Sequence, residues 1–283
     1  MRANYHTHTA RCHHADGTPR EYIEKAIKNG IKILGFSDHV PYPFSNGYHS
    51  GFRMEVSETE DYVTQIADLR EQYKDKIEIH IGYEAEYYPK EFDRMLEQIC
   101  QYECEYLLLG QHCLNNEYDG VPAGGPYADA DLLKTYADQC IDGMRTGAFS
   151  YLAHPDLPNF KGAEADYIEQ MNRICVAAKQ LALPIELNVY GLWDGRVYPN
   201  DKFWRLAADI QNEVIIGCDA HWASFTGNPE AVEAAQKFLS RYGIRPTEDL
   251  TLRDPRIALK NRCNSACMSV CYKAARQSAS IDK

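Results

Sequence analysis

Short apolar runs rich in β-branched residues alternate with longer amphipathic segments along most of this 283-residue chain. Short runs bounded by turn residues are typical of buried strands, whereas apolar positions that recur every three or four residues indicate helices. The pattern predicts strands near residues 3–8, 33–37, 77–84, 105–111, 149–153, 184–189 and 214–218. It predicts helices near residues 19–29, 58–75, 89–102, 129–146, 163–182, 200–211 and 229–242.

Strands that alternate with helices indicate right-handed βαβ units and a parallel sheet, so we expect an α/β fold. Closure of this sheet into a TIM-like barrel would bring the ends of all the strands around one centre. No linker, repeat or low-complexity tract divides the sequence, which predicts a single domain over residues 1–283. Residues 246–283 fit the pattern poorly, and we expect them to form a covering helix or a tail.

Two helix starts carry local signals. Thr18 is followed by Pro19, which places a capping residue before a proline at the first helical position. Ser57 and Glu60 have the spacing of a capping box before the next helix. These signals predict where the first two helices begin.

The composition narrows the classes of partner. A net charge of −11 argues against nucleic acid, whose phosphates favour basic surfaces, but not against a small phosphorylated substrate. No apolar run approaches the ~20 residues of a membrane span and the N-terminus does not resemble a signal peptide, so we expect a cytoplasmic protein without a membrane partner. The ten cysteines are then expected to be reduced. Cys263, Cys267 and Cys271 repeat at helical spacing and are expected to be buried thiols rather than a metal cluster.

Six of the seven predicted strands end on a histidine, an aspartate or a glutamate. Because the carboxyl ends of barrel strands meet at one mouth, we expect these side chains to converge. His6 and His8 lie two residues apart and share one face of a strand, as do Asp219 and His221. Imidazole and carboxylate donors gathered in this way predict a site for several divalent metal ions. The candidate ligands are His6, His8, His14, His39, Glu84, His112, His154, Asp219 and His221.

Spacing alone leaves alternatives open for several of these side chains. His13 is adjacent to His14 and competes with it as a ligand. His80 lies within a strand and is expected to be structural, whereas His49 shares the long loop 40–56 with Arg53 and is expected to reach the substrate. A carboxylate at the end of a strand also has the alternative role of capping the following helix.

The motifs resemble the polymerase and histidinol phosphatase (PHP) superfamily, and within it the monofunctional histidinol-phosphate phosphatases. The resemblance covers roughly residues 4–245 and selects His14 over His13 as the ligand. It implies a distorted seven-stranded (β/α) barrel with three divalent ions of zinc, manganese or iron at its C-terminal mouth. It also implies hydrolysis of a phosphate monoester, typically L-histidinol phosphate in histidine biosynthesis. The motifs that carry it are His6-Thr7-His8-Thr9, Cys12-His13-His14-Ala15, Gly35-Phe36-Ser37-Asp38-His39, Glu84, Gln111-His112, His154-Pro155-Asp156 and Cys218-Asp219-Ala220-His221.

Departures from this family concern the substrate rather than the metal ions. Trp193 stands where these phosphatases often carry an arginine, and Arg196 follows three residues later. Lys161 is the nearby basic residue after the motif that contains His154. Arg53 resembles the loop arginine of the family. We therefore expect Arg53 or Arg196 to hold phosphate oxygens, with Lys161 as a further contact.

The expected mechanism is attack on phosphorus by a metal-bound hydroxide that bridges two of the ions. Glu84 is expected to bridge two ions, while the third ion and an arginine hold the nonbridging phosphate oxygens. Asp156, His13 and Asp38 are candidates for the acid that protonates the leaving oxygen. Asp38 is also expected to orient a ligand.

Other functions remain open at this point. A phosphodiesterase acting on a nucleotide would need a basic groove, which the acidic balance disfavours. An amino-alcohol phosphate other than histidinol phosphate would fit the same chemistry. A metal-binding module without activity would be expected to have lost ligands, and here every ligand position is filled.

Overall fold

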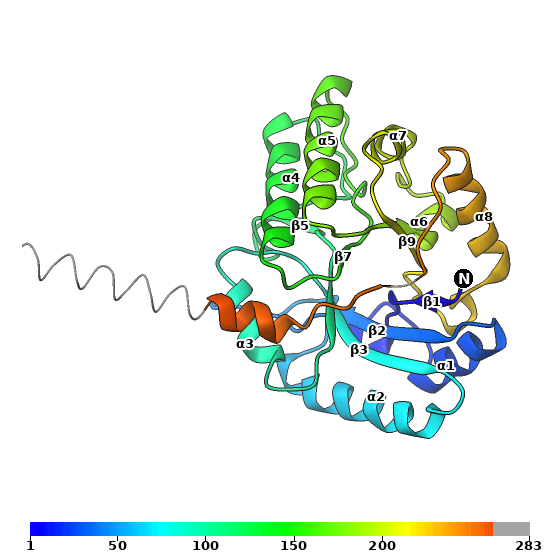
Figure 1. The fold of residues 1–283 in the computed structure, drawn as a ribbon. Coiled ribbons are helices and arrows are strands. Elements are labelled where there is room, and N and C mark those ends of the chain that lie inside the picture. Colours follow the sequence, from blue (N-terminus) through cyan, green and yellow to red (C-terminus); the bar gives the residue numbers. More distant parts are fainter. Residues whose placement is uncertain (249, 263–283) are drawn as a thin grey trace, which may run out of the picture.

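A seven-stranded parallel sheet forms the centre of the protein (Figure 1). The computed structural model describes residues 1–248 and 250–262. The strands follow the spatial order β1-β2-β3-β4-β7-β8-β9, so that consecutive strands of the sheet are neighbours. They are β1 (Ala3–Asn4), β2 (Ile33–His39), β3 (Glu78–Ala85), β4 (Tyr106–Leu109), β7 (Tyr151–Leu152), β8 (Ile185–Asn188) and β9 (Val214–Gly217).

The two edges of this sheet meet and close it into a barrel. Beyond the ends of β1 and β9, Thr7 and Ala220 form a parallel bridge. The amide of His8 donates to the carbonyl of Ala220 at 2.9 Å, and the amide of Ala220 donates to the carbonyl of His6 at 3.3 Å. The predicted seven-stranded α/β barrel is therefore confirmed.

Helices surround the barrel as an outer layer (Figure 1). Each predicted helix is formed, and a short helix, α6 (Val189–Trp193), and a two-stranded hairpin, β5 (Cys113–Leu114) and β6 (Val121–Pro122), are additions that the sequence pattern did not predict. Elements this short carry too few residues to show a period. The predicted helices are α1 (Pro19–Lys28), α2 (Thr59–Tyr73), α3 (Phe92–Ile99), α4 (Ala130–Arg145), α5 (Glu164–Gln180), α7 (Asp201–Ile210) and α8 (Pro229–Ser240).

The two predicted helix starts have different outcomes. Thr18 caps α1, and its side chain and that of Glu21 form a reciprocal capping box. The predicted box of Ser57 and Glu60 is wrong, because Glu55 and Glu58 form the capping pair around a 3₁₀ turn. The 3₁₀ turn covers Val56–Glu58, and α2 begins directly after it at Thr59, close to the predicted start near residue 58.

Apolar side chains fill the inside of the barrel below its C-terminal mouth. Tyr106 is one of three tyrosines of this inner cluster, and its hydroxyl lies 2.9 Å from the carbonyl of Tyr5 and 3.1 Å from that of Phe36. A Cβ added at Gly35 or Gly82 would lie closer than 3.0 Å to the Tyr106 side chain, so glycine provides the space that the ring occupies. The inner cluster consists of Ala3, Tyr5, Ile33, Tyr106, Leu108, Tyr151, Ala153 and Ile215.

The chain after α8 returns across the N-terminal end of the barrel. Residue Thr247 forms a parallel bridge with Ile215 of β9, and Leu250 and Leu252 pack against the inner cluster. Residues 255–262 are helical, and they lie beside α3 (Figure 1). The remaining part of the predicted covering helix or tail, with Cys263, Cys267 and Cys271, lies outside the described residues.

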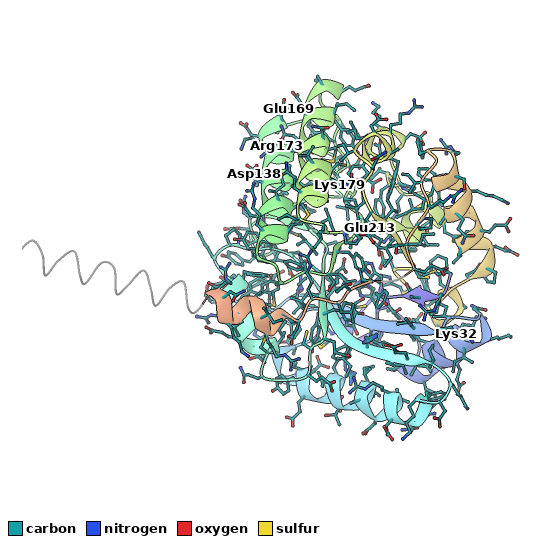
Figure 2. All side chains as sticks on the ribbon, viewed as in Figure 1. Lys32, Asp138, Glu169, Arg173, Lys179 and Glu213 are labelled. Carbon is teal, nitrogen blue, oxygen red and sulfur yellow. The ribbon has the colours of Figure 1, made fainter. Side chains whose placement is uncertain are left out.

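The outer surface of the helical layer is charged. Arg173 on α5 pairs with Asp138 on α4, and both side chains point away from the barrel (Figure 2). The cysteines in the described part of the chain are free thiols. Within the same residues, none of the helices has both the length and the apolar character needed to cross a membrane.

Candidate metal centre

The nine predicted ligands converge at the C-terminal mouth of the barrel. His6 and His8 follow β1, His39 is the last residue of β2, and Glu84 lies near the end of β3. The other five lie in the segments after the 3₁₀ turn at Ala10–Cys12 and after β4, β7 and β9. Convergence follows from the parallel sheet, because every strand delivers its final residues to the same rim. These five are His14, His112, His154, Asp219 and His221.

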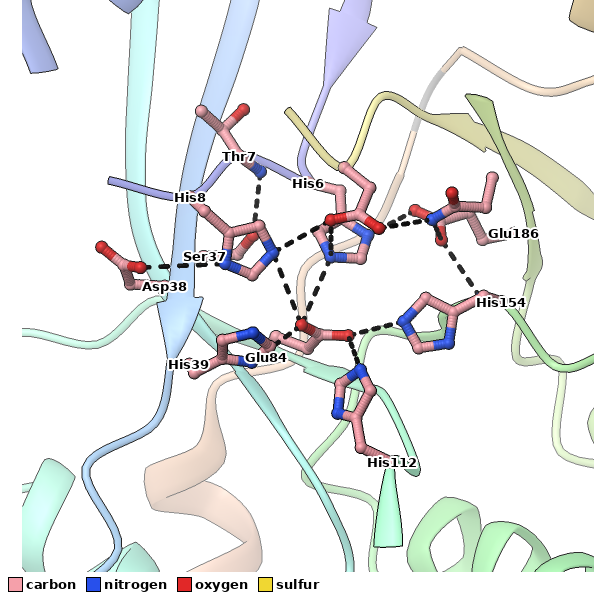
Figure 3. A network of polar contacts seen from close by, with 12 residues as sticks. His6, Thr7, His8, Ser37, Asp38, His39, Glu84, His112, His154 and Glu186 are labelled. Carbon is pink, nitrogen blue, oxygen red and sulfur yellow. Dashed lines mark hydrogen bonds and ion pairs between the residues drawn. The ribbon is translucent and has the colours of Figure 1, made fainter. Parts of the chain in front are cut away.

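The Glu84 carboxylate lies at the centre of this group (Figure 3). It is 1 % exposed, and an imidazole nitrogen of each of five histidines lies within 3.5 Å of its oxygens. Oε2 faces three of the rings, and Oε1 faces the other two, with His154 Nε2 at 2.8 Å. The two oxygens therefore face different groups of histidine rings. The five rings are those of His6, His8 and His39 around Oε2, and of His112 and His154 around Oε1.

Asp219 forms a second centre, and it faces the same Nε2 atoms of His6 and His8 that Glu84 faces. Its Oδ1 lies 3.1 Å from His8 Nε2, 3.5 Å from His6 Nε2 and 3.4 Å from His221 Nδ1. The His14 and His221 rings lie 4.7 Å apart between centroids, which brings the loop histidine into the same cluster. The donors therefore form a continuous group rather than separate pairs.

Several buried nitrogen atoms of this group lack a hydrogen-bond partner, namely His6 Nε2, His8 Nε2, His39 Nδ1 and His221 Nε2. An unpaired buried polar atom is costly unless something else binds it. Nitrogen and oxygen donors of the sets His6–Glu84–His154, His6–His8–Asp219 and His14–His39–His221 lie within 4.8 Å of one another. Imidazole with carboxylate is a donor combination that suits zinc, iron and manganese. The residues present therefore fit divalent metal ions.

The buried carboxylates keep their charge. Burial alone would raise the pKa of Glu84, but His112, His6 and His39 outweigh burial and hold that pKa well below its usual value. The pKa of Asp219 is also held well below its usual value, because neighbouring imidazoles again outweigh burial. Ionised carboxylates are the form that binds cations.

The histidines divide into two groups by protonation. Burial lowers the pKa of His39 well below its usual value and that of His221 to about 3, which keeps both rings neutral as metal ligands require. Burial also acts on His6 and His8, but carboxylates outweigh it and raise the pKa of both, to about 9 for His8. Protons on these two rings balance the buried carboxylates, and a bound cation would displace them.

One carboxylate and one side-chain amide support the ligands from behind. Glu186 Oε1 lies 2.8 Å from His6 Nδ1, and Glu186 Oε2 accepts the amide of His154 at 3.1 Å. Asn188 donates to Asp219 Oδ2 at 3.2 Å. Glu186 was missed by the sequence analysis, although a signal was present: an acidic residue alternates with Asn188 on one face of the otherwise apolar run 184–189. Groups of this kind fix the orientation of metal-binding rings.

Asp38, which was expected to orient a ligand, lies beside His8. Its Oδ2 accepts the amide of Thr9 at 3.1 Å, and its Oδ1 lies 3.7 Å from His8 Nδ1. Cys12, which was not predicted to take part, has a sulfur within 4.8 Å of donor nitrogens of His8 and His221. Burial raises the pKa of the Cys12 thiol to about 12, so it is protonated at neutral pH.

Close packing and backbone strain shape the mouth. A Cβ added at Gly110 would lie closer than 3.0 Å to the Glu84 carboxylate, and one at Gly217 would collide with Glu186. His154 and Asp219 have positive φ angles of 29° and 52°, which non-glycine residues seldom adopt. Such backbone conformations concentrate at functional sites, where surrounding contacts hold them in place.

A cavity of about 650 Å³ opens above the donor cluster. Its floor carries His14, Glu84, Asp219 and other predicted ligands, and its walls include Phe52, Leu157, Tyr190, Arg196 and Tyr198. The Arg196 guanidinium lies 4.2 Å from the centre of the Tyr190 ring and donates to Asp194 at 3.2 Å. The positively charged Arg196 side chain and the donor cluster therefore line the same cavity.

Comparison with known proteins identifies the family. The family model described as PHP domain matches residues 4–190, about two thirds of the chain. The chain belongs to the PHP domain family. A probable histidinol-phosphatase from Deinococcus radiodurans is 29% identical to this PHP domain over 225 residues, which are 76% of this chain and 85% of that protein.

Solved structures share the fold of this PHP domain. A histidinol phosphate phosphatase from Lactococcus lactis, solved with zinc, L-histidinol and phosphate, has a TM-score of 0.65 at 18% identity and covers 90% of this chain and 97% of its own. A putative histidinol phosphatase from Listeria monocytogenes has a TM-score of 0.61 at 19% identity, covering 81% of this chain and 99% of its own. These two structures agree with the barrel described above.

Four other predicted site residues of this PHP domain lie outside the cavity wall. His49 is exposed and pairs with Glu55 at 3.0 Å, and Lys161 lines a separate hollow of about 390 Å³. Asp156 is 2 % exposed, and its Oδ2 accepts the amide of Asn200 at 2.6 Å and the indole N–H of Trp204 at 3.0 Å. His13 is exposed, although its Nδ1 lies 3.3 Å from the carbonyl of Gly51 on the cavity wall.

Arg53 also lies away from the cavity, contrary to the expectation that it faces the phosphate. Its side chain is 2 % exposed and is paired with Glu86 and Glu117. The loop sequence showed a basic residue near the mouth, but the two glutamates come from distant parts of the chain. Arg196 is therefore the arginine that the structure brings to the cavity wall.

Proposed function

We propose that this PHP domain is a divalent-metal-dependent phosphomonoesterase, that L-histidinol phosphate is its substrate, and that it acts in the cytoplasm in histidine biosynthesis. The observation that carries the proposal is the Glu84 carboxylate surrounded by five imidazole rings at the floor of a cavity with Arg196 on its wall. The names of the related proteins support the substrate, because they are described as histidinol phosphatases.

We assign three divalent ions of zinc, manganese or iron to the donor cluster. Glu84 would be shared between two ions, since its oxygens face different rings. Divalent ions supply two kinds of chemistry when bound, because they lower the pKa of coordinated water and neutralise charge on phosphate oxygens. The nine ligands of the proposal are His6, His8, His14, His39, Glu84, His112, His154, Asp219 and His221.

The cavity walls would bind and orient the ester. Arg196 is assigned to the nonbridging phosphate oxygens, because a guanidinium can donate to two of them at once. Its stacking on Tyr190 and its contact with Tyr198, at 3.4 Å between Nη1 and the hydroxyl oxygen, restrict its position before the ester arrives. Phe52 and Leu157 line the same cavity and would exclude water from the leaving group.

The leaving oxygen needs a proton. Of the predicted acids, His13 is the one beside the cavity rim, next to Gly51. Asp156 has its pKa raised to about 6 by burial, but its carboxylate already accepts two N–H groups behind the wall. We therefore assign the proton donor to His13 and a structural role to Asp156.

The test is to measure metal content and hydrolysis on the same sample of purified protein. We expect bound zinc, manganese or iron, and hydrolysis of L-histidinol phosphate in preference to a panel of other amino-alcohol phosphates and sugar phosphates. Removal of the metal with a chelator should abolish hydrolysis, and adding metal back should restore it. Turnover of nucleotide diesters without monoester turnover would overturn the proposal, as would a metal-loaded protein that hydrolyses none of these esters.

A further inference from the structure

Arg53 is a fully buried cation that joins the two long loops of the mouth. It belongs to the loop after β2, and its partner Glu117 belongs to the hairpin loop between β5 and β6. The guanidinium also bonds Glu86, which follows β3. One side chain therefore connects three segments that the barrel delivers to the rim.

The donors of Arg53 are engaged by the protein itself. Nη1 donates to the carbonyl of Val40 at 2.8 Å, and Nε donates to Glu117 Oε2 at 2.9 Å. Nη2 donates to both oxygens of Glu86 at 3.1 Å and to Glu117 at 2.6 Å. The ring of Phe52 covers the guanidinium, 4.5 Å from its centroid. An anion in the cavity would have to displace one of these partners to reach Arg53.

A chain of contacts leads from Arg53 to the donor cluster. Glu86 Oε1 lies 2.8 Å from His112 Nδ1, and the opposite nitrogen of that ring, Nε2, lies 3.4 Å from Glu84 Oε1. A carboxylate at Nδ1 holds a histidine so that Nε2 faces the metal. Phe52, next to Arg53 in sequence, packs edge-on against His39 with ring centroids 5.2 Å apart.

We propose that Arg53 is a positioning residue for the metal centre, which holds Glu86 against His112 and fixes Phe52 over His39. One guanidinium donates to both buried carboxylates and so holds Glu86 where its Oε1 faces Nδ1 of His112. The inference rests on the proposed metal site, and it assigns to Arg53 a role that involves no contact with the phosphate.

The experiment compares Arg53→Met with Arg70→Met in the full chain. Arg70 is a control for the pairing of one guanidinium with two glutamates, although its side chain is 31 % exposed and that of Arg53 is 2 % exposed. It bonds Glu103 at 2.9 Å and Glu105 at 3.2 Å, and Glu105 directly precedes β4, at the opposite end of that strand from the mouth. Metal affinity is measured by titrating zinc into chelated protein, and kcat, KM and the inhibition constant of inorganic phosphate are measured with the metal-loaded protein.

We expect Arg53→Met to weaken zinc binding roughly 10- to 100-fold, as for other residues that orient metal ligands. The KM and the phosphate inhibition constant should stay within about two-fold of wild type, and Arg70→Met should leave zinc affinity unchanged. Glu86→Gln should weaken zinc binding as well, and adding Arg53→Met to it should cause little further loss, because both act through the same ring. Should Arg53→Met not fold, Arg53→Lys keeps the charge without the planar fork and should show a smaller loss of the same kind.

Some outcomes would overturn the inference alone. Unchanged zinc affinity in Arg53→Met together with a raised KM and phosphate inhibition constant would assign Arg53 to the phosphate. Equal losses of zinc affinity in Arg53→Met and Arg70→Met would mean that Arg53 only stabilises the fold in general. Fully additive losses of zinc affinity in the double variant with Glu86→Gln would mean the same. A wild-type protein that binds no metal would instead overturn the proposed function, together with this inference.

Discussion

The two ends of the barrel strands have opposite chemistry, and β3 carries both. At its C-terminal end Glu84 lies among buried nitrogen atoms that have no hydrogen-bond partner. At its N-terminal end His80 is paired with Glu105 at 2.9 Å and Glu78 at 3.0 Å, beside an apolar cluster on which Leu252 packs. The same fold thus satisfies its polar groups at one end and leaves donors available at the other, which separates stability from ligand binding.

Removal of a metal-binding side chain at the mouth is expected to cause the largest loss of zinc affinity and so to test the difference between the two ends most strongly. Asp219→Ala and His8→Ala should each lower zinc affinity and phosphomonoester turnover by more than about 100-fold, because they remove a donor rather than a group that orients one. His80→Ala serves as the control at the other end and should leave both values near wild type. Zinc titration and initial rates measure the effect. Full turnover in Asp219→Ala would contradict the ligand assignment.

A smaller loss is expected from Glu186→Gln. The amide can still accept one hydrogen bond, but it lacks the charge that faces His6 Nδ1 at 2.8 Å. We expect zinc affinity to fall roughly 10- to 100-fold, while the circular dichroism spectrum stays unchanged. Glu103→Gln makes the same change in a partly exposed glutamate that pairs with Arg70, and it should bind zinc as wild type does. Wild-type zinc affinity in Glu186→Gln would show that His6 needs no partner.

Two glycine substitutions would separate the ends of the barrel directly. A Cβ at Gly110 would collide with the Glu84 carboxylate, whereas a Cβ at Gly35 would collide with the ring of Tyr106. Gly110→Ala should therefore lower zinc affinity, and Gly35→Ala should lower the free energy of unfolding by about 1–3 kcal/mol through overpacking. Urea unfolding and zinc titration of both variants measure the contrast. If both variants lost zinc affinity, or both lost only stability, the two ends of the barrel would not have separate roles.

The smallest effect is a dependence of stability on pH at the N-terminal end. Burial lowers the pKa of His80, but Glu105 and Glu78 outweigh burial and raise it above its usual value. The stabilisation from protonated His80 is therefore complete below about pH 6.5 and is lost as the pH rises through the raised value. Because these side chains are partly exposed, we expect about 0.2–1 kcal/mol. His80→Gln should remove this part of the pH profile in urea unfolding, and an unchanged profile would exclude the ion pair as its cause.

The sequence predicts the barrel well because apolar periodicity and strand order are local properties. Every predicted strand and helix is present, and the residues at the strand ends are brought together at the mouth. The short α6 and the β5–β6 hairpin were not predicted, because they contain too few residues to show a period. The wrong capping pair before α2 reflects a choice between two overlapping patterns, Ser57 with Glu60 and Glu55 with Glu58, whereas the predicted start near residue 58 agrees with the observed start at Thr59.

Side-chain partners from distant segments account for the other differences. The role expected for Arg53 depended on its position in a loop, but Glu117 lies 64 residues away in the sequence and occupies its donors. The role of Glu186 could have been predicted from the sequence, because it is a charged residue that shares one face of an otherwise apolar strand with Asn188. Asp156 follows β7 closely, as the ligand His154 does. Its side chain nevertheless accepts a hydrogen bond from Trp204, a distant residue whose packing the sequence does not predict.

The bridge between Thr7 and Ala220 has a consequence for the synthesis of the protein. It joins two segments that lie more than two hundred positions apart in the sequence. His6 and His8 therefore meet Asp219 and His221 only after the later segment has been synthesised. A ribosome must therefore extrude the chain as far as His221 before the complete set of donors exists. A cation that meets the emerging chain earlier would find only part of the donor set.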